Sequence, residues 1–163
     1  MAKTPEIEGV KDTIKALRQI DPELRKQFNT NYGKAVSPMT NAAKDLYDDL
    51  RFPSGTKRKW TTKEGRKLFP LTAAKAKTGV KPKINTSYRG TTALYVMQAN
   101  PAAAIFDIAG TGNKLGSAFS TTFGRGPSRV MWPVAERYQD QVKQNVKELV
   151  EDTEKVIQKE VDR

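Results

Sequence analysis

The feature that most restricts how this chain can fold is the uneven placement of its charge. Residues 51–90 carry twelve Lys and Arg side chains against a single acid, Glu64. The remaining segments balance, so the whole formal net charge of +11 lies in these forty residues. A segment with that much like charge repels itself and gains little by packing alone. We therefore expect residues 51–90 to form a projecting basic arm that becomes ordered only against negative charge.

Composition indicates one ordinary domain. A length of 163 residues suits a single domain over residues 1–163, and a mean hydropathy of -0.67 indicates a modest core. No apolar run approaches the length of a membrane-spanning helix, and "MAKTPEIEGV" lacks the hydrophobic stretch of a signal peptide. We expect a soluble chain that is made in a cytoplasm and has no membrane partner.

The residue types present argue against an enzyme. The chain contains neither Cys nor His, which removes most structural zinc sites, cysteine nucleophiles and the commonest general base at neutral pH. The acid pairs Asp48–Asp49 and Glu151–Asp152 are adjacent and so point in different directions on a helix. The glycine-rich "GTGNKLG" at residues 110–116 lacks the spacing of a phosphate-binding loop and is expected to be flexible. We therefore predict no catalytic residue, no metal site and no cofactor.

Two helical patterns open the chain. In residues 4–20, apolar residues recur at helical spacing after Thr4 and Pro5, which predicts a short amphipathic helix. The pattern restarts after Asp21 and keeps one apolar face as far as residue 50, which predicts a long helix. Pro38 lies inside this pattern and removes one backbone donor, so we expect a kink there or a break into two helices.

The middle of the chain changes its period twice. Residues 54–80 show no sustained period and are rich in Lys, Thr and Gly, which predicts an extended or mobile loop. "PKINTSY" at 82–88 and "TTALYVMQA" at 91–99 are rich in strand-forming residues and flank a glycine turn, which predicts a β-hairpin. "AAAIFDIAG" at 102–110 fits either a third strand or a short helix.

A long helix closes the chain. From Pro133 onward, mainly valine and leucine side chains form a regular apolar stripe, and the outer face is densely charged with both signs. Met131, Trp132 and Pro133 stand between a glycine- and serine-containing loop and this helix. An apolar residue just before a helix commonly packs on its first turns, so we expect these residues, above all Trp132, to anchor the helix start in the core.

Together these patterns predict an α+β fold with one small sheet. It has long N-terminal helices, an antiparallel hairpin with a third strand on one of the two readings above, and a long C-terminal helix. Residues 51–80 form a basic flexible loop inserted into this fold.

The basic arm is the predicted contact surface. Trp60, Phe69 and Tyr88 are interleaved with its cations, as in proteins that stack on single-stranded nucleic acid. Aromatic residues that pin a loop to the protein body give the same pattern, and so does a merely solvated loop. The predicted contacts to DNA or to an acidic protein surface are Lys57, Arg58, Lys59, Lys63, Arg66 and Lys67.

Two short motifs resemble those of a phage family. One is an aromatic residue, an acid and a glycine that close the last strand in that family, here with two extra residues before the glycine: Phe106, Asp107 and Gly110. The other introduces the final helix and matches as Pro127, Met131, Trp132 and Pro133. With the order of elements over most of the chain, the sequence resembles the neck and tail-completion family of long-tailed phages. That group is similar to lambda minor tail protein Z, and the resemblance is closest to its actinobacteriophage branch.

The resemblance implies a structural virion protein of the phage neck. The implied partners are further copies of the chain in a homo-oligomeric ring, expected to be a hexamer, and the neighbouring neck proteins: the head-tail connector and the tail terminator or tube. Such a ring surrounds the path of the packaged DNA. The Lys-rich insertion and the extended terminal helix depart from the family pattern. The alternative is a basic nucleic-acid-binding module, because the basic arm would serve phosphate contacts directly.

Overall fold

The chain forms two compact units, each assembled from segments that are distant in sequence. The computed structural model describes residues 12–13, 15–16, 22–50, 52, 56, 61, 63–65, 71–88, 91–109, 112, 114–124, 126 and 128–162. Unit 1 comprises residues 1–38, 82–95 and 138–163, and unit 2 comprises residues 39–81 and 96–137. The expectation of one domain over residues 1–163 stays a prediction.

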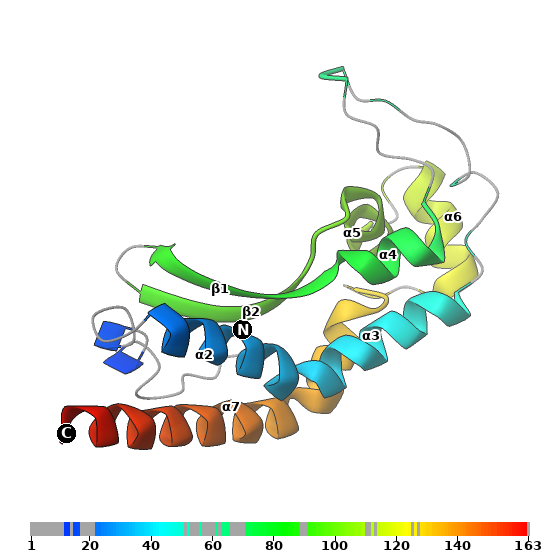
Figure 1. Ribbon diagram of the computed structural model, residues 1–163. Coiled ribbons are helices and arrows are strands. Elements are labelled where there is room, and N and C mark those ends of the chain that lie inside the picture. Colours follow the sequence, from blue (N-terminus) through cyan, green and yellow to red (C-terminus); the bar gives the residue numbers. More distant parts are fainter. Residues whose placement is uncertain are drawn as a thin grey trace. The chain divides into compact units, whose positions relative to one another are not determined.

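The elements confirm the predicted α+β class (Figure 1). They follow in the order α2 (Pro22–Ala35), α3 (Ser37–Asp49), α4 (Ala73–Gly79), β1 (Val80–Tyr88), β2 (Thr91–Gln98), α5 (Pro101–Ile108), α6 (Lys114–Phe123) and α7 (Met131–Val161). The two strands pair as the predicted antiparallel hairpin. No helix in the described part of the chain has both the length and the apolar composition needed to cross a bilayer.

The predicted break near Pro38 is confirmed. The helical pattern of residues 21–50 divides into α2 and α3, with Val36 in the turn between them. The Val36 amide still donates to the Tyr32 carbonyl at 3.1 Å, so the helical hydrogen bonding of α2 extends one residue into the turn. Pro38 is the second residue of α3, where a missing N–H breaks no helical hydrogen bond.

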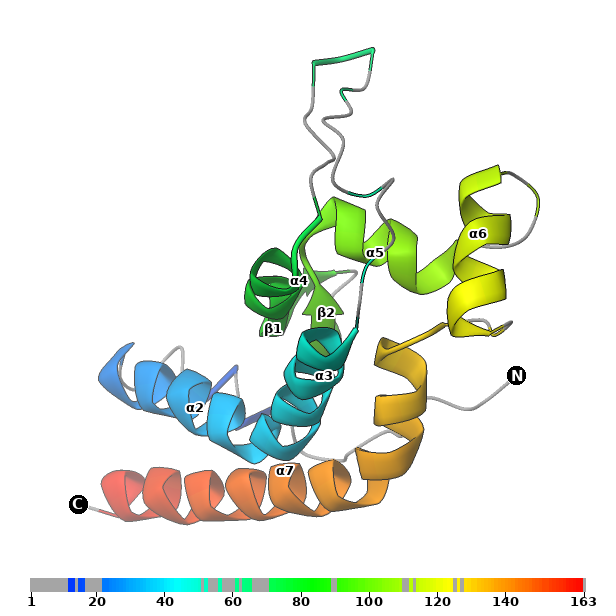
Figure 2. The same cartoon turned by 90° about the vertical axis from the view of Figure 1, so that its right-hand side faces the viewer.

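Unit 1 packs two helices and the outer part of the hairpin around a small core. α2 lies beside the C-terminal part of α7 (Figures 1 and 2). Phe28 of α2 and Val150 of α7 are its buried centre, and partly buried apolar residues surround them: Leu24, Ile84, Leu94, Leu149 and Ile157. The apolar stripe that predicted the terminal helix therefore contributes to this core.

Only residues 12–13 and 15–16 of the expected helix over 4–20 are described, and they are helical. Thr13 is buried, and its hydroxyl donates to Glu154 Oε1 of α7 at 3.0 Å. This bond attaches the N-terminal segment to the terminal helix within unit 1. The rest of the predicted helix lies outside the described residues.

Unit 2 is built around a cluster of phenylalanine rings. Phe106 of α5 is fully buried, and the rings of Phe52, Phe119 and Phe123 each meet it edge to face at centroid distances of 5.1 Å. Such edge-to-face pairs stabilise a core beyond the area that they bury. α5 also contacts α4. The aromatic residue that the sequence placed in a structural motif is therefore the centre of this core.

Two predictions for the middle of the chain need correction, and one alternative is decided. Residues 54–80 are not all loop, because residues 73–79 form α4, capped by the Thr72 hydroxyl, which accepts from the Lys75 amide at 3.2 Å. Of the two alternatives for residues 102–110, the helix is confirmed over residues 102–108, because Asn100 caps and Pro101 begins α5. Residues 114–116 of the expected flexible loop instead begin α6, an element that the sequence patterns did not predict.

Candidate functional site

The start of α7 differs from the prediction at Trp132. α7 begins at Met131 rather than Pro133, and Trp132 is 47% exposed instead of buried in the core. Its indole N–H donates to Glu136 Oε1, one turn further along the same helix, at 2.8 Å. Met131 is half-buried and Pro133 is exposed. The expected burial of Trp132 in the core is therefore wrong, and the buried residue beside it is Val130, at 1% exposure.

A carboxylate from another helix holds the start of α7 in place. Asp107, in the last turn of α5, is 3% exposed. Its Oδ1 accepts the backbone amides of Arg129, Val130 and Met131 at 3.0, 2.6 and 3.3 Å. Helix N-termini leave such amides without intrahelical partners, and a negative charge there also complements the helix dipole. Asp107 is therefore the N-terminal cap of α7, supplied across the fold.

Ser128 completes this cap. Its hydroxyl donates to Asp107 Oδ2 at 2.7 Å and accepts the Trp132 amide at 2.9 Å. Pro133 has no amide, and the Val134 amide makes the first helical bond, to the Val130 carbonyl at 3.2 Å. Every backbone donor from residue 129 to residue 134 thus has an acceptor. Proline is tolerated at residue 133 because an amide in the first turn of a helix has no intrahelical acceptor, so its absence breaks no helical hydrogen bond.

Arg129 provides the reverse cap, at the C-terminus of α5. Its guanidinium donates to the carbonyls of Phe106 and Ala109 at 2.6 and 2.9 Å, and to Ser120 Oγ of α6 at 3.2 Å. It also lies 5.7 Å from the ring centroids of Phe106 and Phe119, within the range of a cation–π interaction. Burial lowers the pKa of Arg129, and the Asp107 carboxylate counteracts this effect.

The consequence is a rigid junction that ties α5, α6 and α7 together. We call Asp107, Ser128 and Arg129 the reciprocal cap, because each helix end is held by a side chain from outside it. Beside this junction Trp132 and Ile108 are exposed, at 47% and 66%. Large apolar side chains on a rigid support are typical of protein contact surfaces. The junction itself contributes packing and hydrogen bonds rather than a reactive group.

The basic arm has a fixed base in unit 2. Thr56 and Leu71 are buried, and the Leu71 amide donates to the Thr56 carbonyl at 3.0 Å. Thr56 and Leu71, which flank residues 57–70 in the sequence, are therefore held side by side. This 57–70 segment contains all six predicted contact residues and one acid. Residues 73–88 of the expected arm belong to α4 and β1 instead.

Only the middle of the 57–70 segment is described. Lys63 and Glu64 form a turn, and Gly65 follows with a positive φ of 77°, a conformation that favours glycine. All three residues are exposed. In the sequence, this turn lies about halfway between Thr56 and Leu71. The remaining predicted contacts lie outside the described residues: Lys57, Arg58, Lys59, Arg66 and Lys67.

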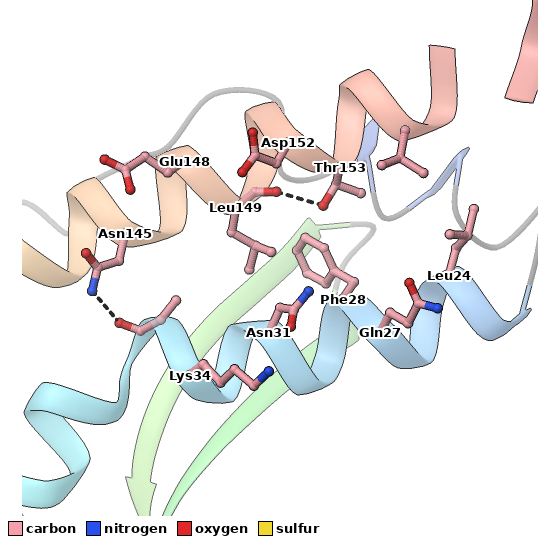
Figure 3. Close-up of a pocket in the computed structure, with 12 residues that line it drawn as sticks. Leu24, Gln27, Phe28, Asn31, Lys34, Asn145, Glu148, Leu149, Asp152 and Thr153 are labelled. Carbon is pink, nitrogen blue, oxygen red and sulfur yellow. Dashed lines mark hydrogen bonds between the residues drawn. The ribbon is translucent and has the colours of Figure 1, made fainter. Parts of the chain in front are cut away.

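Unit 1 contains a groove that the sequence did not predict. It lies between α2 and α7, is open to solvent, and has a volume of about 460 Å³ (Figure 3). Its apolar lining consists of Leu24, Phe28, Leu149 and Val156, with Ala35 at one end. The α2 side spans eleven residue steps, from residue 24 to residue 35, which corresponds to about 16 Å.

Polar side chains border this groove on both helices. α7 contributes the carboxylates of Glu148 and Asp152, and Lys34 is a cation on the α2 side. The amides and hydroxyl come from both helices: Gln27, Asn31, Asn145 and Thr153. Asn145 is fixed by donating to the Ala35 carbonyl at 2.9 Å, and Thr153 by donating to the Leu149 carbonyl at 2.7 Å (Figure 3). The groove is thus apolar inside, with both carboxylates on one border.

The sequence did not indicate the roles of Asp107 and Arg129, because both side chains bond to backbone groups far away in the sequence. Arg129 was visible only as one cation in a glycine-containing loop, and Asp107 only as a motif residue, because their partners lie about twenty residues away in sequence. The α7 carboxylates were visible only as part of a charged helix face. No pattern in the sequence indicated that α2 would lie beside them.

Comparisons with known proteins add no relative to this description. No protein-family model matches the sequence, and neither curated proteins nor solved structures gave a match. Within the described residues, no group of three acids converges as a metal ion would require.

Proposed function

We propose that the protein is a structural virion protein of a phage neck. In this proposal, copies of the chain assemble as a ring between head connector and tail tube, around the path of the DNA. The observation that carries the proposal is that the two motifs of the family resemblance meet at one junction. Asp107 from the first motif accepts the amides of residues 129–131, at the start of the second motif. Motifs that cap each other's helices have a structural role.

The exposed side chains beside the junction support a protein partner. Trp132 and Ile108 remain accessible although the backbone that carries them is fixed by hydrogen bonds. A preorganised aromatic residue loses little conformational entropy on binding, and Trp is enriched among the residues that dominate protein interfaces. This favours an assembly protein over a chain that functions as an isolated monomer.

The alternative function is a basic nucleic-acid-binding module. The six cations of the 57–70 segment, held on a fixed base, favour this alternative. Phosphate contacts would make DNA affinity fall steeply with salt, because each neutralised phosphate releases counterions. They would carry no sequence preference, because phosphate contacts do not read bases.

Negative-stain imaging of the purified protein tests the proposal. Rings, together with phage heads and tails that fail to join in particles lacking the protein, support the neck function. A protein that stays monomeric at every concentration and retards DNA in a gel contradicts it and supports the alternative.

Replacement of five cations by Gln separates the two functions further: Lys57, Arg58, Lys59, Arg66 and Lys67. If phosphates are the partner, the slope of log affinity against log salt falls by about 0.9 for each phosphate that the variant no longer neutralises. If protein is the partner, assembly of joined particles fails while DNA binding persists. If neither changes, the 57–70 segment is only a solvated loop.

A further inference from the structure

We propose that the groove between α2 and α7 binds an amphipathic helix of a partner protein, one whose apolar face is flanked by basic side chains. The inference goes beyond the neck proposal and does not depend on it. All residues that carry it belong to unit 1. It follows from the helical spacing of the groove lining, from the apolar interior and from the charges on the two borders.

Both walls of the groove are helix faces. The lining runs from Asn145 to Val156 on α7 and from Leu24 to Ala35 on α2, in both cases at the three- and four-residue spacing of one helix face. The two faces lie along each other for about three helical turns. A groove between two such faces is the shape into which the side chains of a third helix pack.

The backbone of the walls favours a helical occupant over an extended one. The amides and carbonyls of α2 and α7 bond within their own helices, so these walls offer no strand edge with which an extended peptide pairs. A helix satisfies its own backbone and presents only side chains. Apolar surface is available to them, because Val156 is 41% exposed and Leu24 and Leu149 are half-buried.

The charge on the α7 border selects a basic flank. Glu148 and Asp152 are exposed and stand four residues apart, so both carboxylates lie on the same side of the groove. Glu148 accepts from the Gln144 side-chain amide at 2.8 Å, which is neutral and leaves the carboxylate charge in place. Asp152 pairs with Lys155 at 3.1 Å, but both side chains are largely exposed, and such pairs contribute little. Two cations one turn apart on a partner helix complement these carboxylates.

The α2 border fixes the direction of the occupant. Lys34 is exposed there, on the opposite side of the groove from the carboxylates (Figure 3). It precedes Ala35, whose carbonyl accepts the Asn145 side chain at 2.9 Å, so the cation lies at the Asn145 end of the groove. The partner helix therefore carries an acid toward α2 at this end and cations along α7.

Three synthetic peptides of about 16 residues, or four to five helical turns, test the inference. All three contain the same leucine, alanine, lysine and glutamate residues. The first has a leucine stripe with lysines on one flank and a glutamate on the other, the second has these charges exchanged, and the third has the order scrambled so that no stripe forms. In fluorescence anisotropy we expect the first peptide to bind at least about tenfold more tightly than the second, and the third not to bind saturably.

A charge reversal in the groove provides the matched test. The groove variant, Glu148→Lys with Asp152→Lys, should reverse the preference and bind the second peptide more tightly than the first. The control variant, Asp140→Lys with Glu151→Lys, makes the same change at exposed positions of α7 that do not line the groove, so the original preference should remain. Circular dichroism identifies a variant that fails to fold, and a reversed preference requires a folded groove.

Several results overturn the inference. It is wrong if the first peptide does not bind, if it binds no more tightly than the scrambled one, or if its preference survives in the groove variant. Hydrogen exchange of the complex must show protection in α2 and α7, and protection elsewhere alone contradicts the site. If peptide binding rises and then falls as the protein concentration increases, another copy of the chain occupies the groove, and the inference is also wrong. None of these results bears on the neck proposal, which the imaging of rings decides.

Discussion

Removal of the Asp107 carboxylate is the most direct test of the reciprocal cap. In Asp107→Ala the three amides that it accepts lose their charged acceptor, but they are not equally affected. The Arg129 amide keeps the Asp107 carbonyl at 3.1 Å, and the Met131 bond is already long at 3.3 Å. The Val130 amide has the shortest bond, at 2.6 Å, and belongs to a residue that is 1% exposed. Most of the loss therefore falls on this one amide.

The expected loss of stability follows from the unequal dependence of the three amides on Asp107. A buried donor that loses its partner costs about 1 to 3 kcal/mol, and bonds to charged groups lie at the upper end. Loss of a helix cap adds about 1 kcal/mol. We expect Asp107→Ala to lower the free energy of unfolding by about 3 to 4 kcal/mol. Asp107→Asn retains an acceptor oxygen of the same size, so we expect a loss of about 1 kcal/mol.

Urea unfolding followed by circular dichroism measures this difference. The protein is kept dilute, so that self-association does not add to its stability. The variants are compared by the shift of the midpoint at unchanged slope. A loss below about 1 kcal/mol in Asp107→Ala would refute the cap, since the buried amide would then have found another acceptor. An Asn variant as unstable as the Ala variant would show that the charge, not the acceptor, is what stabilises the junction.

Three further predictions follow from exposure, close packing and burial. Because Trp132 is largely exposed, Trp132→Ala should change the free energy of unfolding by less than about 1 kcal/mol. The same variant should weaken self-association measured by sedimentation. A large loss of stability would show instead that Trp132 anchors the start of α7 in the core. Gly79→Ala would place a Cβ against Gln98 Oε1, the atom that accepts the Asn100 amide at 2.9 Å. The variant should therefore unfold at a lower temperature than the control Gly33→Ala, whose Cβ meets open space. Burial raises the pKa of Tyr32, so the stability from its neutral hydroxyl is present below the unfolded pKa of about 10 and is lost as pH rises above it. Urea unfolding between about pH 8 and 11 should therefore show a steeper alkaline loss in the unmodified protein than in Tyr32→Phe, and equal slopes would contradict the burial argument.

Local patterns in the sequence determined most of the helices and the hairpin. The apolar stripe of residues 134–161 predicted α7, because a 3.6-residue period places those side chains on one face whatever they pack against. Pro38 predicted the break between α2 and α3, because its missing donor and fixed φ are local properties. The strand-forming residues on either side of a glycine turn predicted β1 and β2 for the same reason.

Composition gave no sign of a short helix whose start is stabilised by a capping side chain. α4 lies in a Lys-, Thr- and Gly-rich stretch, and its start depends on one hydroxyl, that of Thr72. α5 was ambiguous because a short apolar run fits a strand or a helix equally well. The Asn100 side chain, which accepts the Ala103 amide at 3.0 Å, decided for the helix.

Only the tertiary structure decided the role of the residues around Met131. The sequence indicated an apolar anchor before the helix, and the natural choice was Trp132, the largest apolar side chain there. Asp107 instead holds the backbone of residues 129–131, so the buried position falls on Val130 and Trp132 points to solvent. Likewise, the carboxylates of Glu148 and Asp152 border a groove only because α2 lies beside α7. Sequence periodicity assigns a side chain to a face of its own helix, whereas the partner of that face depends on contacts between segments far apart in the chain.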